Sequence, residues 1–294
     1  MHLIDWLVLG GVFGGLIALG ALLSKKSGRS TDDFMVAGRK MPWWLIGMSE
    51  AATHFNTSGM LRDTRRVRQD GLAGLYGMWS YMVEVAVSNV WFMRLWRRAR
   101  FRTPMEFYHA RYSGPQATFS RIYDSLILGV LTSIFWSAIG LVGMKKIAGV
   151  MLDLPPQLEA LGMSVSSDWV VVISIGMVAL LYSVSAGARG VYWTDFIQFF
   201  IAIASAYALL YIVMQEVGWN VGLREKILSD GASGEKFIKM TQPWNIALIY
   251  YFLVAPFLNH GGYNPGIQRM LAVRREKEVV LAELLGSIVN FSFR

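Results

Sequence analysis

Long hydrophobic runs separated by short polar stretches form the main pattern of this 294-residue chain. A helix needs roughly 20 mainly apolar residues to cross the ~30 Å hydrocarbon core of a bilayer. Eight runs approach or reach that length. The pattern therefore predicts clear membrane helices over residues 6–24, 125–144, 169–188 and 190–215, and weaker ones over residues 41–61, 71–93, 244–268 and 279–294.

The composition agrees with a protein whose solvent is lipid. Only 16% of the residues are charged and 54% are hydrophobic, whereas roughly 25% are charged in an average soluble domain. The formal charge of +8 comes from short basic clusters between uncharged runs, which is typical of membrane-protein loops and argues against a nucleic-acid partner. The chain has no Cys, which excludes disulfides and Cys-ligated metal sites. It also lacks nucleotide-binding and hydrolase motifs, so we do not expect an enzyme.

These patterns predict an all-α, polytopic membrane protein with one transmembrane domain over residues 1–294. Most of the 28 Lys and Arg fall in the first, third, fifth and seventh connections, so the positive-inside rule places the N-terminus outside. The arginine cluster at residues 62–68 argues the other way locally. The polar segment 216–243 then becomes an external loop, and the expected location is the plasma membrane, in bacteria the inner membrane.

The last run is too short to span a bilayer unaided. It holds about 15 residues, contains Glu283 and ends without flanking charges or aromatic anchors. We therefore expect an interrupted chain, either a piece of a longer protein or a gene fragment.

Two of the runs contain stretches that a straight helix does not accommodate. Residues 51–59 read A-A-T-H-F-N-T-S-G, and residues 257–266 read F-L-N-H-G-G-Y-N-P-G. Transporters with inverted repeats bind substrate and coupling ions at broken helices in corresponding positions of the two halves. The two runs are five helices apart, as a five-plus-five repeat requires. The alternative is that the polar residues only bond between helices and that Gly and Pro mark an ordinary kink.

Acidic residues inside membrane runs are candidate functional residues because burying their charge is costly. Asp195 leads, since its carboxylate could attract a cation near the cytoplasmic end of its run; the alternative is an N-terminal helix cap. Glu84 could contact a polar substrate or pair with the arginines at 62–68. Glu50 and His54 are spaced i, i+4, which places them on one helix face where they could share a proton.

Five segments of the chain stand out in order along the sequence. They read DDFMVAGRKMPWWLIG (32–47), GLAGLYGMW (71–79), RTPMEF (102–107), SAGARGVYWTDFIQ (185–198) and IQRMLAVRREKE (267–278). Together they resemble the sodium:solute symporter family. The resemblance covers nearly the whole chain, and the segments around Asp195 and Gln268 are the specific ones. It implies the inverted-repeat transporter fold, with one extra helix, a full first repeat and the start of a second.

The resemblance also implies site residues. The family's sodium site uses backbone carbonyls of the first broken helix, which here fall at Ala52 and Phe55, and its Asp on the sodium path matches Asp195. The other half of that site comes from a later helix, which this sequence lacks. The substrate cavity would draw on both breaks, through Asn56, Thr57, Glu84, His260, Asn264 and Gln268. Glu50 departs from the family in replacing an apolar position, and Gly261 and Gly262 stand where many sugar transporters place an aromatic gate.

The sequence therefore predicts a secondary active transporter that couples sodium entry to the uptake of a small polar solute and is incomplete in this chain. The alternative is a non-transporting membrane sensor module or an inactive gene remnant. Sequence beyond Arg294 would separate them, because further hydrophobic runs indicate a symporter and a soluble kinase-like region indicates a sensor.

Overall fold

The structure is a computed structural model that describes residues 3–27, 30–76, 79, 92–152, 155, 157–160, 163–229, 232–238, 249–254 and 265–293. Helices dominate it, which confirms the predicted all-α class. The described chain divides into two compact units, made of Met1–Pro42, Ala99–Thr194 and Pro265–Arg274, and of Trp43–Arg98, Asp195–Asn264 and Arg275–Arg294. Each unit is described by itself.

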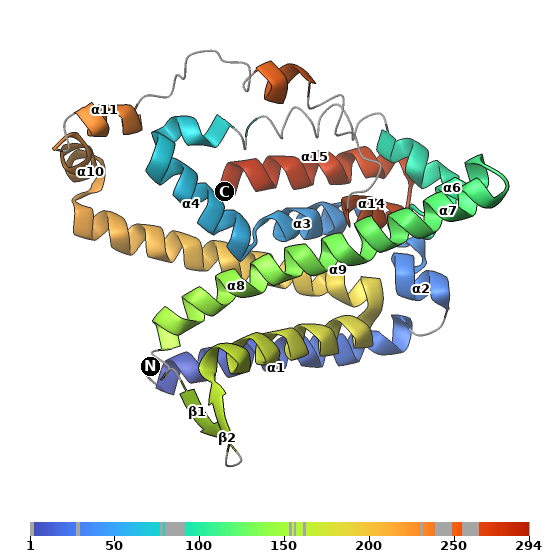
Figure 1. The fold of residues 1–294 in the computed structure, drawn as a ribbon, viewed down its shortest axis with the longest axis horizontal. Helices are drawn as coiled ribbons and strands as arrows, with labels where there is room; N and C mark the ends of the chain where they lie inside the picture. Colours follow the sequence, from blue (N-terminus) through green and yellow to red (C-terminus); the bar gives the residue numbers. More distant parts are fainter. Residues whose placement is uncertain are drawn as a thin grey trace. The chain divides into compact units, whose positions relative to one another are not determined.

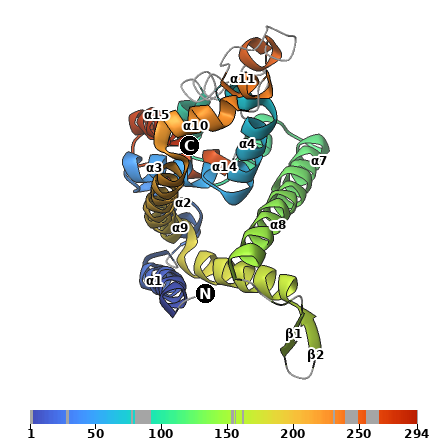
Figure 2. The ribbon, with the colours of Figure 1, turned by 90° about the vertical axis from the view of Figure 1, so that its left-hand side faces the viewer.

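Helices and one hairpin make up the first unit. Its elements are α1 (Leu3–Ser27), α2 (Thr31–Val36), the short η1 (Ala37–Arg39), α6 (Glu106–Arg111), α7 (Pro115–Asp124), the π-helical η3 (Ser125–Leu131), α8 (Thr132–Leu152), β1 (Gln157–Ala160), β2 (Met163–Ser166), the residues of α9 (Ser167–Val217) up to Thr194, and α14 (Pro265–Leu271). Figure 2 shows α7 and α8 continuing as one long helix. The two antiparallel strands project between α8 and α9, and the sequence analysis did not predict them.

Parts of three of the segments that carry the family resemblance meet in the first unit. The Gln268 side-chain amide donates to the carbonyls of Met35 and Arg102, both at 2.9 Å. Met41 forms a β-bridge with the segment that follows α14. Its N–H donates to the Ala272 carbonyl at 3.1 Å, and its carbonyl accepts from the Arg274 N–H. The core around these contacts is apolar and buried, and includes Val36, Ile267, Met270, Leu271 and Val273.

The second unit contains α3 (Trp43–His54), α4 (Thr57–Asp70), η2 (Gly71–Leu75), residues 92–98 of a helical segment that ends at residue 99, α9 from Asp195 on, α10 (Trp219–Leu228), α11 (Ala232–Ile238), the π-helical η4 (Tyr250–Val254) and α15 (Glu276–Phe293). Figure 1 shows α3 in blue beside α15 in red, although nearly the whole sequence separates them. Ala51, Phe199 and Val289, from α3, α9 and α15, form the buried core where these three helices meet.

Glycines allow α3 and α15 to approach closely. A Cβ at Gly47 would lie 2.5 Å from the Ala282 carbonyl oxygen, and one at Gly286 would lie 2.9 Å from the Gly47 carbonyl oxygen. By contrast, Gly10 and Gly14 of α1, which show the small-residue spacing of packed membrane helices, have no described atom within 4 Å of such a Cβ. Close packing occurs at the α3–α15 contact instead.

Three described helices are long and apolar enough to cross a membrane: Leu3–Ser24, Pro115–Leu152 and Ser183–Val217. They contain the predicted first, fourth and sixth runs. The predicted fifth run corresponds to a shorter apolar helix, Ser167–Leu181. It joins the sixth through a kink at Gly187, whose φ of 57° and ψ of −167° suit only glycine, so the predicted break between the two runs is a kink inside α9.

The other runs differ more. The predicted second run stops at Leu61, whereas α4 continues to Asp70 and carries the arginines at 62–68 on a helix rather than in a loop. Arg62 and Arg66 lie 3.2 and 3.9 Å from the carboxylate of Asp63. Most of the third and seventh runs lie outside the described residues. The predicted external loop 216–243 contains the helices α10 and α11.

Candidate functional site

The predicted first break is confirmed. Helix α3 ends at His54 and α4 begins at Thr57, with Phe55 and Asn56 between them. The Phe55 N–H donates to the carbonyls of Ala51 and Ala52, each at 3.1 Å. Asn56 caps α4, because its side-chain oxygen accepts from the Gly59 N–H at 2.8 Å.

The break places opposite partial charges next to each other. The C-terminal end of α3 carries a partial negative charge, and the N-terminal end of α4 carries a partial positive charge. Among the described residues, no hydrogen bond ends on the carbonyl of Phe55. Carbonyls at such an unwound end suit a small monovalent cation, while the start of the second half-helix suits an anionic or polar substrate group.

Asp195 lies beside α3. Its carboxylate accepts a hydrogen bond of 2.6 Å from the Ser49 hydroxyl, and Ser49 is completely buried. Ser49 sits about one turn before the Ala52 carbonyl, so α3 connects the carboxylate to the break. Asp195 lies well inside α9, so its alternative reading as a helix cap is wrong.

Aromatic contacts hold α9 against α3 on both sides of this hydrogen bond. The Trp44 ring meets Phe196 edge-on with centroids 5.5 Å apart, and Phe55 meets Phe199 in the same way at 6.1 Å. These T-shaped pairs prefer a fixed ring geometry. The position of Asp195 relative to the break is therefore fixed by packing as well as by Ser49.

A second polar group lies on another face of α3. His54 Nε2 is 3.2 Å from Glu50 Oε1, which confirms the predicted i, i+4 contact. Glu50 is buried against Gly286 of α15, and the same helix buries Glu283 and Asn290. Buried charged groups are costly unless paired, so this interface departs from a purely apolar contact.

The residues predicted for the substrate cavity have different positions and contacts in the structure. Asn56 uses its side chain within the break, since its amide also donates to the Thr53 carbonyl at 2.8 Å and its oxygen accepts from Ser58 at 2.7 Å. Thr57 begins α4. Gln268 serves as a tie between α14 and two backbone carbonyls. These contacts lend no support to Gln268 as a cavity residue, and that role stays a prediction. Glu84, His260 and Asn264 lie outside the described residues.

Sequence reasoning missed Ser49 and did not assign Glu283 to a site. Nothing local marks Ser49, because its partner is 146 positions away. Glu283 had a usable signal: the buried positions of α15 are Val279, Ala282, Glu283, Gly286, Val289 and Asn290. Their spacing of three and four residues is that of one packed helix face.

Comparisons with known proteins identify the family of this chain. The family model described as "Sodium:solute symporter family" matches residues 34–289. The chain therefore belongs to the sodium:solute symporter family, as the resemblance implied, and this is a family of sodium-coupled transporters of small solutes in membranes.

Three relatives illustrate the similarity. A sodium/glucose cotransporter of Vibrio parahaemolyticus is 25% identical over 312 residues, which cover 99% of this chain and 54% of that protein. The sodium/sialic acid symporter SiaT of Proteus mirabilis is 22% identical over 81% of this chain and 44% of its own length. A solved structure of a substrate-bound, outward-open, Na+-coupled sialic acid symporter shares the fold with a TM-score of 0.75 at 20% identity. That match covers 98% of this chain and 57% of the solved chain. The chain thus spans about half the length of these relatives.

Proposed function

We propose that this chain is part of a secondary active transporter that couples sodium entry to the uptake of a small polar solute across the plasma membrane. It contributes the α3–α4 helix break, where sodium binds, and Asp195, which lies on the sodium path. The observation that carries the proposal is the Ser49–Asp195 hydrogen bond beside the α3–α4 break. It holds a carboxylate about one helix turn from carbonyls that suit a monovalent cation.

In this proposal, sodium is bound by the Ala52 and Phe55 carbonyls and approaches or leaves along Asp195. Thr57 and Asn56, at the start of α4, face the solute together with Glu84, His260, Asn264 and Gln268. All of these belong to one transmembrane domain with the N-terminus outside and the segment 216–243 as an external loop. Family membership and the relatives' sodium coupling support the ion.

The test is binding of radioactive sodium to membranes that contain the native gene product. Asp195→Asn keeps the shape of the side chain and removes its charge. A unit charge about one helix turn from the ion contributes on the order of 3 kcal/mol at an effective dielectric constant of about 20, so we expect sodium affinity to fall roughly tenfold or more.

Asp168→Asn is the matched control. Asp168 begins the same helix, is half exposed and pairs with Lys145 at 2.5 Å, so this variant should bind sodium like the wild type. Equal sodium affinity of Asp195→Asn and the control would remove Asp195 from the sodium path. Absence of saturable sodium binding in the wild type would refute the proposed function as a whole.

A further inference from the structure

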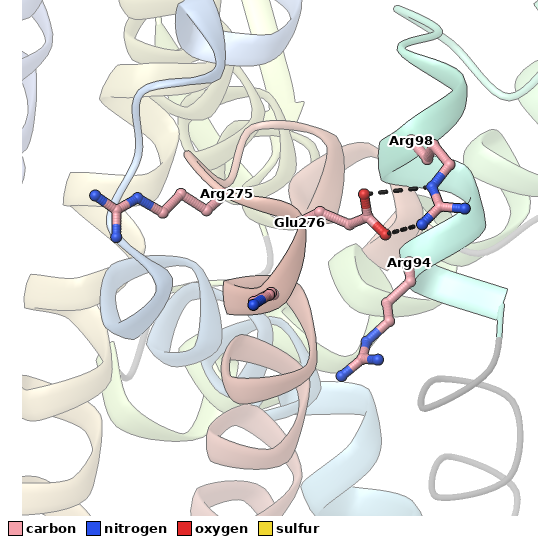
Figure 3. Close-up of a pocket in the computed structure, with 5 residues that line it drawn as sticks. Arg94, Arg98, Arg275 and Glu276 are labelled. Carbon is pink, nitrogen blue, oxygen red and sulfur yellow. Dashed lines mark hydrogen bonds and ion pairs between the residues drawn. The ribbon is translucent and has the colours of Figure 1, made fainter.

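A basic pocket lies at the N-terminal end of α15, within the second unit. Its volume is about 620 Å³. Its walls are Arg94 and Arg98 of the helical segment 92–99, and Arg275, Glu276 and Lys277 at the start of α15 (Figure 3). The proposed transport mechanism uses none of these residues.

The pocket has a strong excess of positive charge. Four of its five lining residues are cationic and one is acidic, which leaves a formal charge of +3 (4 − 1). Glu276 is held by Arg98 through two hydrogen bonds of 2.9 and 3.4 Å. The dashed lines in Figure 3 mark this pair. One cation is therefore neutralised by a fork-shaped contact, and three are not neutralised by an acid of the pocket.

The other three cationic side chains of the pocket form weak ion pairs or none with the described acidic residues. Arg275 is 73% exposed and lies 3.8 Å from Glu278, and Figure 3 shows its guanidinium directed away from Glu276. Within the part of the chain that the structure describes, neither Arg94 nor Lys277 makes an ion pair. The N-terminal end of the 18-residue α15 adds a partial positive charge. The excess positive charge of the pocket therefore favours binding of an anion.

An apolar stripe continues from the pocket along α15. Lys277 is exposed and is followed at helical spacing by Leu281, Leu284 and Ile288, which are 48%, 42% and 59% exposed. On the neighbouring segment, Phe92 and Leu95 are 40% and 56% exposed close to Arg94 in sequence. A cationic pocket that opens onto an apolar stripe fits a ligand with an anionic head and a hydrocarbon tail. Basic pockets between membrane helices on the cytoplasmic side bind anionic lipid headgroups.

We propose that this basic pocket binds the phosphate group of an anionic phospholipid, with an acyl chain along Leu281, Leu284 and Ile288. Arg94 and Lys277 supply the free charge, and Arg98 is shared between Glu276 and the lipid. Lys and Arg are concentrated in the third and seventh connections, which contain these residues and are assigned to the inner side. The lipid therefore comes from the inner leaflet.

The first experiment is native mass spectrometry of the purified wild-type protein, titrated with phosphatidylglycerol or phosphatidylcholine. The two lipids have similar tails, so the comparison isolates the anionic head. We expect phosphatidylglycerol to bind more tightly and its affinity to fall as salt increases. Equal affinity for the two lipids would overturn the proposal. Efficient displacement of phosphatidylglycerol by inorganic phosphate would also overturn it, since it would identify a site for free phosphate.

Variants assign the binding to this pocket. One basic residue near an anionic lipid surface is worth roughly fivefold in affinity, so Arg94→Gln combined with Lys277→Gln should weaken phosphatidylglycerol binding roughly twentyfold to thirtyfold. The charge-matched control is Arg224→Gln combined with Lys226→Gln, two exposed residues of α10. Equal losses in the two double variants would show non-specific attraction and contradict the proposal.

Glu276→Gln provides a test with the opposite sign. It removes the only acid among the lining residues and releases Arg98, so we expect phosphatidylglycerol affinity to rise roughly fivefold. A disrupted fold cannot produce tighter and still selective binding. Unchanged or weaker binding by this variant would contradict the role given to Arg98.

Discussion

The hydroxyl of Ser49 fixes which way the Asp195 carboxylate is directed. Ser49 donates to Asp195 at 2.6 Å from a fully buried position. Because this hydrogen bond orients the partly buried Asp195 carboxylate, Ser49 acts as a positioning residue for the proposed sodium path.

Ser49→Ala should therefore weaken sodium binding, by less than Asp195→Asn, because the carboxylate is kept while its donor is lost. The measurement is the same sodium-binding titration on membranes. Ser185→Ala is the control, since Ser185 is exposed on α9 and its hydroxyl donates to the Leu181 carbonyl of the same helix. Equal sodium affinity of the two serine variants would contradict the positioning role.

Tyr108, in α6, gives a prediction about pH. Its phenol donates to Asp124, and this hydrogen bond, with burial, raises the pKa of Tyr108 to about 12. An unfolded tyrosine has a pKa of about 10. The folded state therefore favours the neutral phenol, and the resulting stability is fully present below about pH 10 and is lost as the pH rises through 12.

Titration of tyrosinate absorbance should thus show a step near pH 12 that disappears in Tyr108→Phe. Tyr123→Phe removes a phenol from the exposed surface of α7 and serves as the control. The same high-pH step in wild type and Tyr108→Phe would show that the Asp124 contact does not hold the phenol neutral.

Local contacts between residues were predictable from the sequence, and distant ones were not. Glu50 and His54 meet because a helix brings positions four apart together, so their spacing was sufficient. The Ser49–Asp195 and Gln268–Met35 contacts join residues 146 and 233 positions apart. Such contacts depend on how whole helices pack, which residue spacing does not determine.

At the scale of elements, the break between α3 and α4 was predictable because its cause is local. Asn56 prefers to cap a helix with its own side chain, and it does so here through the Gly59 N–H. The extent of α4 was not predictable in the same way. Its arginines look like a membrane-flanking loop, but they are good helix formers and α4 continues through them to Asp70.

The close contact of α3 with α15 predicts that Gly47→Ala destabilises the second unit. The new methyl group would lie 2.5 Å from the Ala282 carbonyl oxygen, where only movement of a helix backbone can make room. Such overpacking costs about 1–3 kcal/mol, and we expect a lower midpoint of thermal unfolding in detergent.

Gly140→Ala is the matched control on α8. Nothing lies within 4 Å of a Cβ at Gly140, and alanine favours a helix over glycine by about 1 kcal/mol, so the midpoint should hold or rise. A Gly47→Ala protein as stable as this control would show that α3 and α15 are not in close contact.

For the whole molecule, the family and the fold class followed from sequence, whereas the division into two units did not. Hydrophobic runs predicted the fold class, and five short motifs predicted the family. The family match over residues 34–289 confirms the family. The units combine segments from the beginning, middle and end of the chain. The five-plus-five repeat stays a prediction, since most of its second broken helix, with His260 and Asn264, lies outside the described residues.

Sodium dependence of stability tests the central claim most directly. A ligand that binds only the folded state stabilises it by about 2.7 kcal/mol at a concentration 100 times its Kd. Protein purified from its native membrane should therefore unfold at a higher temperature in sodium chloride than in potassium chloride of equal concentration. Equal midpoints in the two salts would contradict a sodium site at the α3–α4 break.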